Sequence, residues 1–388
     1  MVRKSLPLLI ACLFTLTSVG AVADVAVARL ASIAEVSSQT RALAVTSDAI
    51  ALAGDSITVL SRENPDQVSA VTLVTSDARL ITDLFAFEDR FFAVGIGESQ
   101  STLATTPSSS TSSSTSSTIN PDSITALSNV GSAQGLTRLV LVEFDSAGQV
   151  INESVYDSDL PLIPLTLKVL GSTIAIVGSK VSERGVQGFL ATTDLELNFL
   201  SFNRFGSDST VIRSLASLRT LYGSSSERLA GTDLKSVQDG VILYLDSDGS
   251  IKRVVRSFLS SSQRSWDQVS NAHLVVGEVK RGKIAEVAIT KFSPQGSPQW
   301  NTRFPGSDGH LDLRTLGLVT SKKLDGISRI KPKGKNAVFI EYVSKGLSKR
   351  GTISRVASIP AREIIDMANG YAVIVDRDGR FQLVPLAP

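Results

Sequence analysis

One pattern constrains the fold of this chain more than any other: a strand, a tight turn ending in glycine, and a second strand recur several times. The turns are Asp145-Ser-Ala-Gly148, Asp246-Ser-Asp-Gly249, Ser293-Pro-Gln-Gly296 and Asp376-Arg-Asp-Gly379. An apolar run precedes each turn, and strand-like residues follow it. A unit repeated along a chain indicates a repeat architecture, in which each copy buries its apolar face against its neighbours.

Short apolar runs that end in a small or polar residue supply the period. They end at Gly54, Gly95, Gly178, Gly231 and Gly277, and two weaker members end at Glu341 and Asp376. We interpret each run as the start of a unit, and, allowing for two insertions, the period is about 45–50 residues, as in propeller blades. The sequence therefore predicts an all-β fold, a single β-propeller of seven four-stranded blades, with six or eight blades as alternatives. The strand-like segment from Val25 to Ile33 is expected to complete the last blade and close the ring.

Two of the units also share an ending. Asn203-Arg-Phe-Gly-Ser-Asp208 and Thr302-Arg-Phe-Pro-Gly-Ser-Asp308 both place an aromatic residue close to a glycine at the end of a strand. With the Asp-x-x-Gly turns, these endings make residues 138–310 resemble the β-propeller repeats of secreted bacterial proteins. The resemblance implies the architecture and no particular reaction.

The first residues have the organisation of a signal peptide. Arg3 and Lys4 precede an apolar stretch, and Ala21-Val-Ala23 is a cleavage site of the A-x-A type. We expect a signal peptide at 1–23, cleaved near Ala23, and a propeller domain at 24–388 that is secreted or attached to the cell envelope. A lipoprotein linked through Cys12 is the minor alternative. Because Cys12 is the single cysteine, cleavage near Ala23 excludes disulfides, thiolate catalysis and cysteine metal sites from the mature chain.

Residues 99–137 read as a low-complexity insertion within the second blade. From 105 to 118 every residue except Pro107 is Ser or Thr. Such a composition cannot bury enough apolar surface to fold. We expect a tolerated disordered loop, with a glycosylated spacer as the alternative.

Motifs that would carry chemistry are weak. The Asp-x-Asp-Gly turns resemble the start of calcium loops, but sister repeats replace them with Ser293-Pro-Gln-Gly296, which favours a turn role in which Asp accepts backbone N–H bonds. The two histidines, His273 and His310, have no spacing that suggests zinc binding or a nucleophile–base pair. Phosphate loops, dinucleotide fingerprints and nucleophile elbows are absent from the sequence. We therefore expect no catalytic residue, metal or cofactor.

A basic stretch near the C-terminus is the one candidate binding feature. Between 321 and 355, ten basic residues face only Asp325 and Glu341. The candidate patch comprises Lys322, Lys323, Arg329, Lys331, Lys333, Lys335, Lys345, Lys349 and Arg350, and Arg355 completes the ten. Such a patch suits an anionic envelope polymer or another protein; ordinary solvated surface is the alternative. Nucleic acid is not expected, because the chain is predicted to be exported and Tyr342 is the one notable aromatic residue in the stretch.

The sequence thus predicts an exported, monomeric, non-catalytic binding or scaffold propeller of the cell envelope, with no transmembrane segment after the signal peptide. The alternative is a hydrolase or lyase whose site is assembled in the central channel from scattered Asp, Arg and Tyr residues. Charged groups gathered in the channel would favour the enzyme. A filled channel would favour the scaffold.

Overall fold

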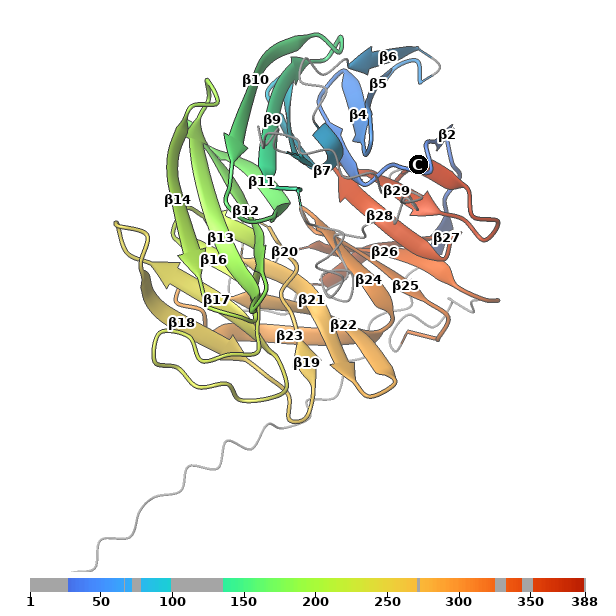
Figure 1. Cartoon of the computed structure of the whole chain (residues 1–388). Helices are drawn as coiled ribbons and strands as arrows, with labels where there is room; N and C mark the ends of the chain where they lie inside the picture. The colour runs from blue at the N-terminus through green and yellow to red at the C-terminus, as the bar shows by residue number, and fades with distance from the viewer. Residues whose placement is uncertain are drawn as a thin grey trace, which may run out of the picture.

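A computed structural model of the protein describes residues 27–65, 67–71, 78–98, 135–270, 273–324, 333–343 and 352–386. These residues form seven β-sheets arranged as blades around a central axis (Figure 1). They contain no helix, and so none that could cross a membrane. The predicted all-β, seven-bladed propeller is confirmed.

Each blade is an antiparallel sheet whose first strand is the innermost. Blade 1 contains β3 (Ala42–Val45), β4 (Ala49–Ala53), β5 (Ile57–Ser61) and β6 (Val68–Val71). Blade 2 contains β7 (Ala78–Phe87), β8 (Arg90–Gly97), β9 (Arg138–Asp145) and β10 (Val150–Asp157). Blade 3 contains β11 (Leu162–Leu170), β12 (Thr173–Ser182), β13 (Gly185–Asp194) and β14 (Phe199–Phe205). The predicted insertion falls between β8 and β9, and its residues 99–134 lie outside the described residues.

The next three blades follow the same plan. Blade 4 contains β15 (Thr210–Ser217), β16 (Thr220–Ser225), β17 (Asp239–Leu245) and β18 (Ile251–Ser257). Blade 5 has its inner edge divided into β19 (Gln263–Arg264) and β20 (Gln268–Val269), followed by β21 (Leu274–Arg281), β22 (Ile284–Phe292) and β23 (Pro298–Pro305). Blade 6 contains β24 (Ser307–Asp312), β25 (Thr315–Thr320), β26 (Asn336–Val343) and β27 (Thr352–Pro360).

The two ends of the chain meet in blade 7, which closes the ring. This blade contains β28 (Glu363–Ala368), β29 (Tyr371–Val375) and β30 (Phe381–Pro385), with β2 (Ala34–Val36) as its outermost strand. The preceding strand, β1 (Val27–Arg29), instead runs parallel to β27 and adds a fifth strand to blade 6. The expected role of residues 25–33 is therefore corrected: within the described part of this segment, β1 extends blade 6, whereas Ile33 already donates its backbone N–H to Leu383 O of blade 7, and β2 completes that blade.

The glycine-ended runs are not the starts of blades. Most of them form the second strand, as in β4, β8, β12, β21 and β29, because neighbouring strands and blades cover most of that strand and its buried stretch is largely apolar. Two runs were misassigned. Leu229 lies in the connection between β16 and β17, and residues 338–341 belong to β26, the third strand of blade 6.

Glycine in the second strand accommodates an irregular first strand. A Cβ atom on Gly178 would lie 2.1 Å from the carbonyl oxygen of Ile163, and one on Gly223 would lie 1.9 Å from that of Val211. The first strands of blades 3 and 4 shift register next to these glycines. A β-bulge re-aims the side chains that follow it. The bulges therefore help to decide which inner-strand residues face the channel.

Candidate functional site: the central channel and a basic surface

The innermost strands surround the axis of the ring, where propellers commonly place a site (Figure 1). The sequence alone does not decide whether the polar side chains of these strands gather into a site in the channel. In the structure these side chains reach from one blade to the next. Among the described residues, these side chains thus form a series of contacts between neighbouring blades.

Every junction between neighbouring blades carries a polar contact. Between blades 1 and 2 it is a backbone hydrogen bond, in which Ile81 N donates to Gly54 O at 2.7 Å, next to an apolar cluster that the two blades share. The other six junctions each use a side chain. In four of them a side-chain oxygen accepts from a backbone N–H of the next blade: Asp83 Oδ2 from Leu167 N at 2.6 Å (blades 2 and 3), Gln268 Oε1 from Leu311 N at 2.6 Å (blades 5 and 6), Asp312 Oδ2 from Gly370 N at 2.8 Å (blades 6 and 7), and Asp366 Oδ2 from Leu43 N at 2.8 Å (blades 7 and 1). Between blades 3 and 4, Thr166 Oγ1 donates to Arg213 O at 2.6 Å, and between blades 4 and 5, Arg213 Nε lies 3.4 Å from Asp267 Oδ1.

Lys168 reaches furthest across the channel. From blade 3, its Nζ donates to Leu215 O of blade 4 and to Val269 O of blade 5, both at 3.0 Å. Burial lowers the pKa of this ammonium to about 8, against the opposing attraction of Asp83. The Lys168 side chain is half-buried. The channel is therefore bridged by a cation that already has protein acceptors.

Asp83 is the acidic side chain whose charge interacts with that of Lys168. Burial raises the pKa of its carboxyl to about 7, while the backbone N–H groups of Leu167 and Leu84 and the charge of Lys168 act in the opposite direction. Perturbed pairs of this kind are common at catalytic sites, and structural networks produce them as well. Here the carboxyl binds backbone groups of two blades, which indicates a structural role.

The histidines lie in different settings. His273, at a positive φ of 54°, lies in the turn before β21, and its Nδ1 is 3.2 Å from the Tyr222 hydroxyl of blade 4. Burial, followed by the nearby charge of Lys291, lowers the pKa of His273. His310 lies in β24, with Nδ1 3.4 Å from Gln268 Nε2. Their described contacts place them with different partners and form no nucleophile–base pair.

The repeated turns are held by their aspartates and glycines. Asp145 Oδ1 accepts from the backbone N–H groups of Ala147 and Gln149, and Asp376 Oδ1 accepts in the same way from Asp378 and Arg380. Gly148 and Gly379 have φ values of 82° and 90°, which favour glycine. The turn interpretation is confirmed, with one correction. The copy at 376–379 joins the second and third strands of blade 7, whereas the others join third and fourth strands.

The described part of the basic stretch lies at one end of the ring. Because the strands of a blade alternate in direction, the start of the first strand, the connection from second to third, and the end of the fourth share one face. We call it the entry face. Lys322, Lys323, Lys333 and Lys335 are exposed there, in the connection between β25 and β26. Arg329 and Lys331, from the same connection, lie outside the described residues, as do Lys345, Lys349 and Arg350, which follow β26 at its other end.

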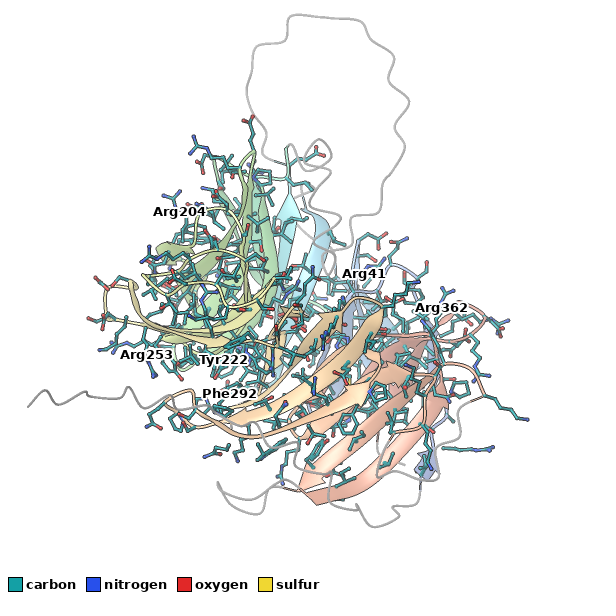
Figure 2. The ribbon with its side chains drawn as sticks, turned by 90° about the horizontal axis from the view of Figure 1, so that it is seen from below. Arg41, Arg204, Tyr222, Arg253, Phe292 and Arg362 are labelled. Carbon is teal, nitrogen blue, oxygen red and sulfur yellow. The ribbon has the colours of Figure 1, made fainter. Side chains whose placement is uncertain are left out.

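Blade 7 adds cations that the sequence did not single out. Arg362 (Figure 2), Arg377 and Arg380 are exposed in connections at the same face. Arg377 donates to the carbonyl oxygens of Lys333 and Lys335, so the loops of blades 6 and 7 are tied together. We define the basic surface as Lys322, Lys323, Lys333, Lys335, Arg362, Arg377 and Arg380. None of these seven forms an ion pair within the described part of the chain.

Comparison with known proteins gives architecture and no family. No protein-family model and no curated protein matches the chain. Among solved structures it is similar to the WD40 domain of Toxoplasma gondii coronin, at 10% identity over 94% of this chain and 88% of that chain, with a TM-score of 0.50. The Dos1 propeller is 8% identical over 93% of this chain and 95% of that chain, with a TM-score of 0.44. Prolyl oligopeptidase B from Galerina marginata is 10% identical over 79% of this chain and 41% of that chain, with a TM-score of 0.42. At these identities the likeness shows the propeller fold alone.

Proposed function

We propose that the protein is an exported, non-catalytic binding module that presents its basic surface to an anionic polymer of the cell envelope. The supporting observation is the contrast in how charges are used. Channel carboxyls bind backbone N–H groups across blade junctions. The seven cations of the basic surface are exposed, and none of them has a carboxylate partner among the described residues. The signal-peptide pattern at residues 1–23 supports export.

The basic surface extends across two blades. Arg377 bridges the connection that contains Lys333 and Lys335, and Arg362 lies against the turn at 376–379, where a Cβ on Gly379 would be 3.3 Å from its Nη2. Among the described residues, three acids share these loops, namely Glu363, Asp376 and Asp378, while Asp325 of the connection between β25 and β26 lies outside the described residues. The Asp376 carboxyl is already engaged by its own turn. A net positive, spatially fixed set of donors remains, which suits a chain of phosphate or carboxylate groups.

The alternative, a hydrolase or lyase acting in the channel, needs acids and bases that can meet a substrate. Asp83, Asp312 and Asp366 each accept a backbone N–H of the following blade. Freeing one of them would leave a buried donor without a partner, which costs about 1–3 kcal/mol. The arrangement therefore favours the binding module.

The test is charge reversal at matched sites. Lys335, Arg362 and Arg380 would be replaced by Glu together, and binding to long-chain polyphosphate and to polyglutamate measured by fluorescence anisotropy at low and moderate salt. The control reverses Arg184, Arg204 and Lys283, which are exposed on blades 3 and 5 and form no ion pair with any described carboxylate. Both variants carry the same change in net charge.

We expect the basic-surface variant to bind about ten- to hundredfold more weakly, and the control to bind almost normally, because exposed charges act over roughly 8–10 Å at these salt concentrations. Binding by the parent should also fall steeply as salt rises. Equal losses of affinity in the two variants would show that net charge alone, and not the position of the cations, determines binding. Absence of binding by the parent to both polymers would contradict the proposal.

A further inference from the structure

The outer parts of blades 7 and 1 do not fill the space between them. A groove of about 390 Å³ remains at this seam, within the size range of ligand sites. Leu52, Thr58, Leu60 and Val68 line it from blade 1. Opposite them lie residues 33–37 of the N-terminal segment that contains β2. We call this space the seam groove.

Strand pairing explains why the groove has an apolar floor. Leu60 pairs with both Ile50 and Val68, and directly paired residues share a face of the sheet. On that face, Leu52 and Leu60 belong to the apolar cluster that joins blades 1 and 7. The groove is thus the outward continuation of an existing inter-blade interface.

Short outer strands leave this interface unfinished. The fourth strands of blades 1 and 7, β6 and β2, have four and three residues as described, whereas the fourth strands of the other blades, β10, β14, β18, β23 and β27, have seven to nine. Both short strands border the same groove. As a result Val68 is 56% and Ile33 44% exposed. The described part of the chain leaves room at this seam for a few residues of extended chain.

The rim of the groove carries one sign of charge. Among the described residues that line it, Glu35 and Asp55 are the charged ones, and both are exposed acids without a hydrogen-bond or ion-pair partner. A basic side chain would complement them. The molecule also shows that its blades accept additional extended chain at the rim, because β1 lies against β27 as a fifth strand of blade 6.

We propose that the seam groove binds an extended segment of a partner protein. Its alternate apolar side chains would pack on Leu60 and Val68, and a basic side chain would face Asp55. Apolar contact would supply affinity and the acidic rim would supply selectivity, as in other modes of extended-peptide recognition. This surface is separate from the basic surface, so either proposal can fail without the other.

The test uses fluorescein-labelled, end-blocked pentapeptides: Val-Lys-Val-Lys-Val, its Glu counterpart, and a Lys peptide with a central Pro. Binding to the full chain would be followed by anisotropy. Thr58→Trp fills the groove from its blade 1 wall. The matched control is Leu200→Trp, on the outer strand of blade 3, where Leu200 is 60% exposed. Asp55→Lys reverses the charge of the rim. Melting temperature and circular dichroism verify that each variant folds.

The Lys peptide should bind best, and Thr58→Trp should weaken it by about tenfold or more while Leu200→Trp leaves it unchanged. Asp55→Lys should reverse the preference towards the Glu peptide. Binding insensitive to Thr58→Trp, or no binding of the Lys peptide by the parent, would overturn the proposal. Self-association abolished by Thr58→Trp would also overturn it, because the occupant would then be a second copy of the chain.

Discussion

The channel and the basic surface contain similar kinds of residue and use them in opposite ways. In the channel, Asp83, Asp312 and Asp366 each accept a backbone N–H from a neighbouring blade. On the basic surface, Lys335, Arg362 and Arg380 point into solvent without ion-pair partners. An enclosed polar group must be matched by the protein itself, since its unpaired form is costly. A polar group at the rim is matched by water and can exchange water for a ligand.

The largest expected effect comes from an enclosed ion pair. Arg256 and Asp239 are joined at 3.1 Å, with side chains 3% and 0% exposed. Asp239→Ala leaves a buried guanidinium without its carboxylate, and we expect a loss of about 3–5 kcal/mol in the free energy of unfolding, measured with urea. Asp233→Ala, in an exposed pair with Arg228, should cost about 0–1 kcal/mol. Similar losses in both variants would remove the distinction between enclosed and exposed charges.

A channel carboxyl should have an intermediate effect. Asp366→Ala removes the acceptor for Leu43 N at 2.8 Å and for Met367 N at 2.7 Å. Leaving these donors unpaired should cost about 1–3 kcal/mol. Asp378→Ala, an exposed residue of the same blade, should stay within about 0.5 kcal/mol. If Asp366→Ala were as stable as the parent, the junction between blades 7 and 1 would depend on apolar packing alone.

The dependence of stability on pH separates the two regions further. The pKa of Asp83 is raised from 3.8 to about 7 by burial, so between these values the native chain holds a proton that the unfolded chain has lost. Stability from this group therefore falls as pH rises from about 4 to 7. Urea denaturation at several pH values should show a smaller fall in Asp83→Asn than in the parent. An unchanged pH profile would show that this carboxyl titrates normally.

The smallest effect is expected for the Ser/Thr tract. Deleting residues 105–118 shortens a connection between β8 and β9, and loop-closure entropy changes only slowly with length. The melting temperature should stay nearly constant, as measured by circular dichroism. A cooperative loss of structure would show that the tract packs against the blades.

The predictable part of the fold depended on local signals. The Asp-x-x-Gly turns identified hairpins because Asp145 caps N–H groups two and four residues ahead, and Gly148 supplies a positive φ. Apolar runs identified the second strands, which are buried on both faces. The first strands were harder to recognise, because channel residues such as Asp83 and Lys168 interrupt their apolar pattern. For this reason the apolar pattern marks second strands, such as the one that contains Gly178, more clearly than the first strands that begin each blade.

The candidate sites were less accessible to sequence reasoning. The basic stretch was visible because its lysines are close in sequence, but Arg362, Arg377 and Arg380 join them only when blade 7 packs beside blade 6. The seam groove gave no signal in the sequence, because it lies between two short strands, β2 and β6, that belong to different blades and face each other only when the ring closes. A short strand next to a long one would have been equally compatible with the sequence.

By itself, the sequence determined the repeating unit, its turns and the apolar second strands, because these depend on residues within a few positions of one another. The tertiary structure decided which residues meet across blade junctions. Asp366 and Leu43 are 323 residues apart and meet only when the ring closes. It also decided that β1 joins blade 6 while β2 joins blade 7. Such pairings depend on the number of blades and on the geometry of closure, which no local pattern contains.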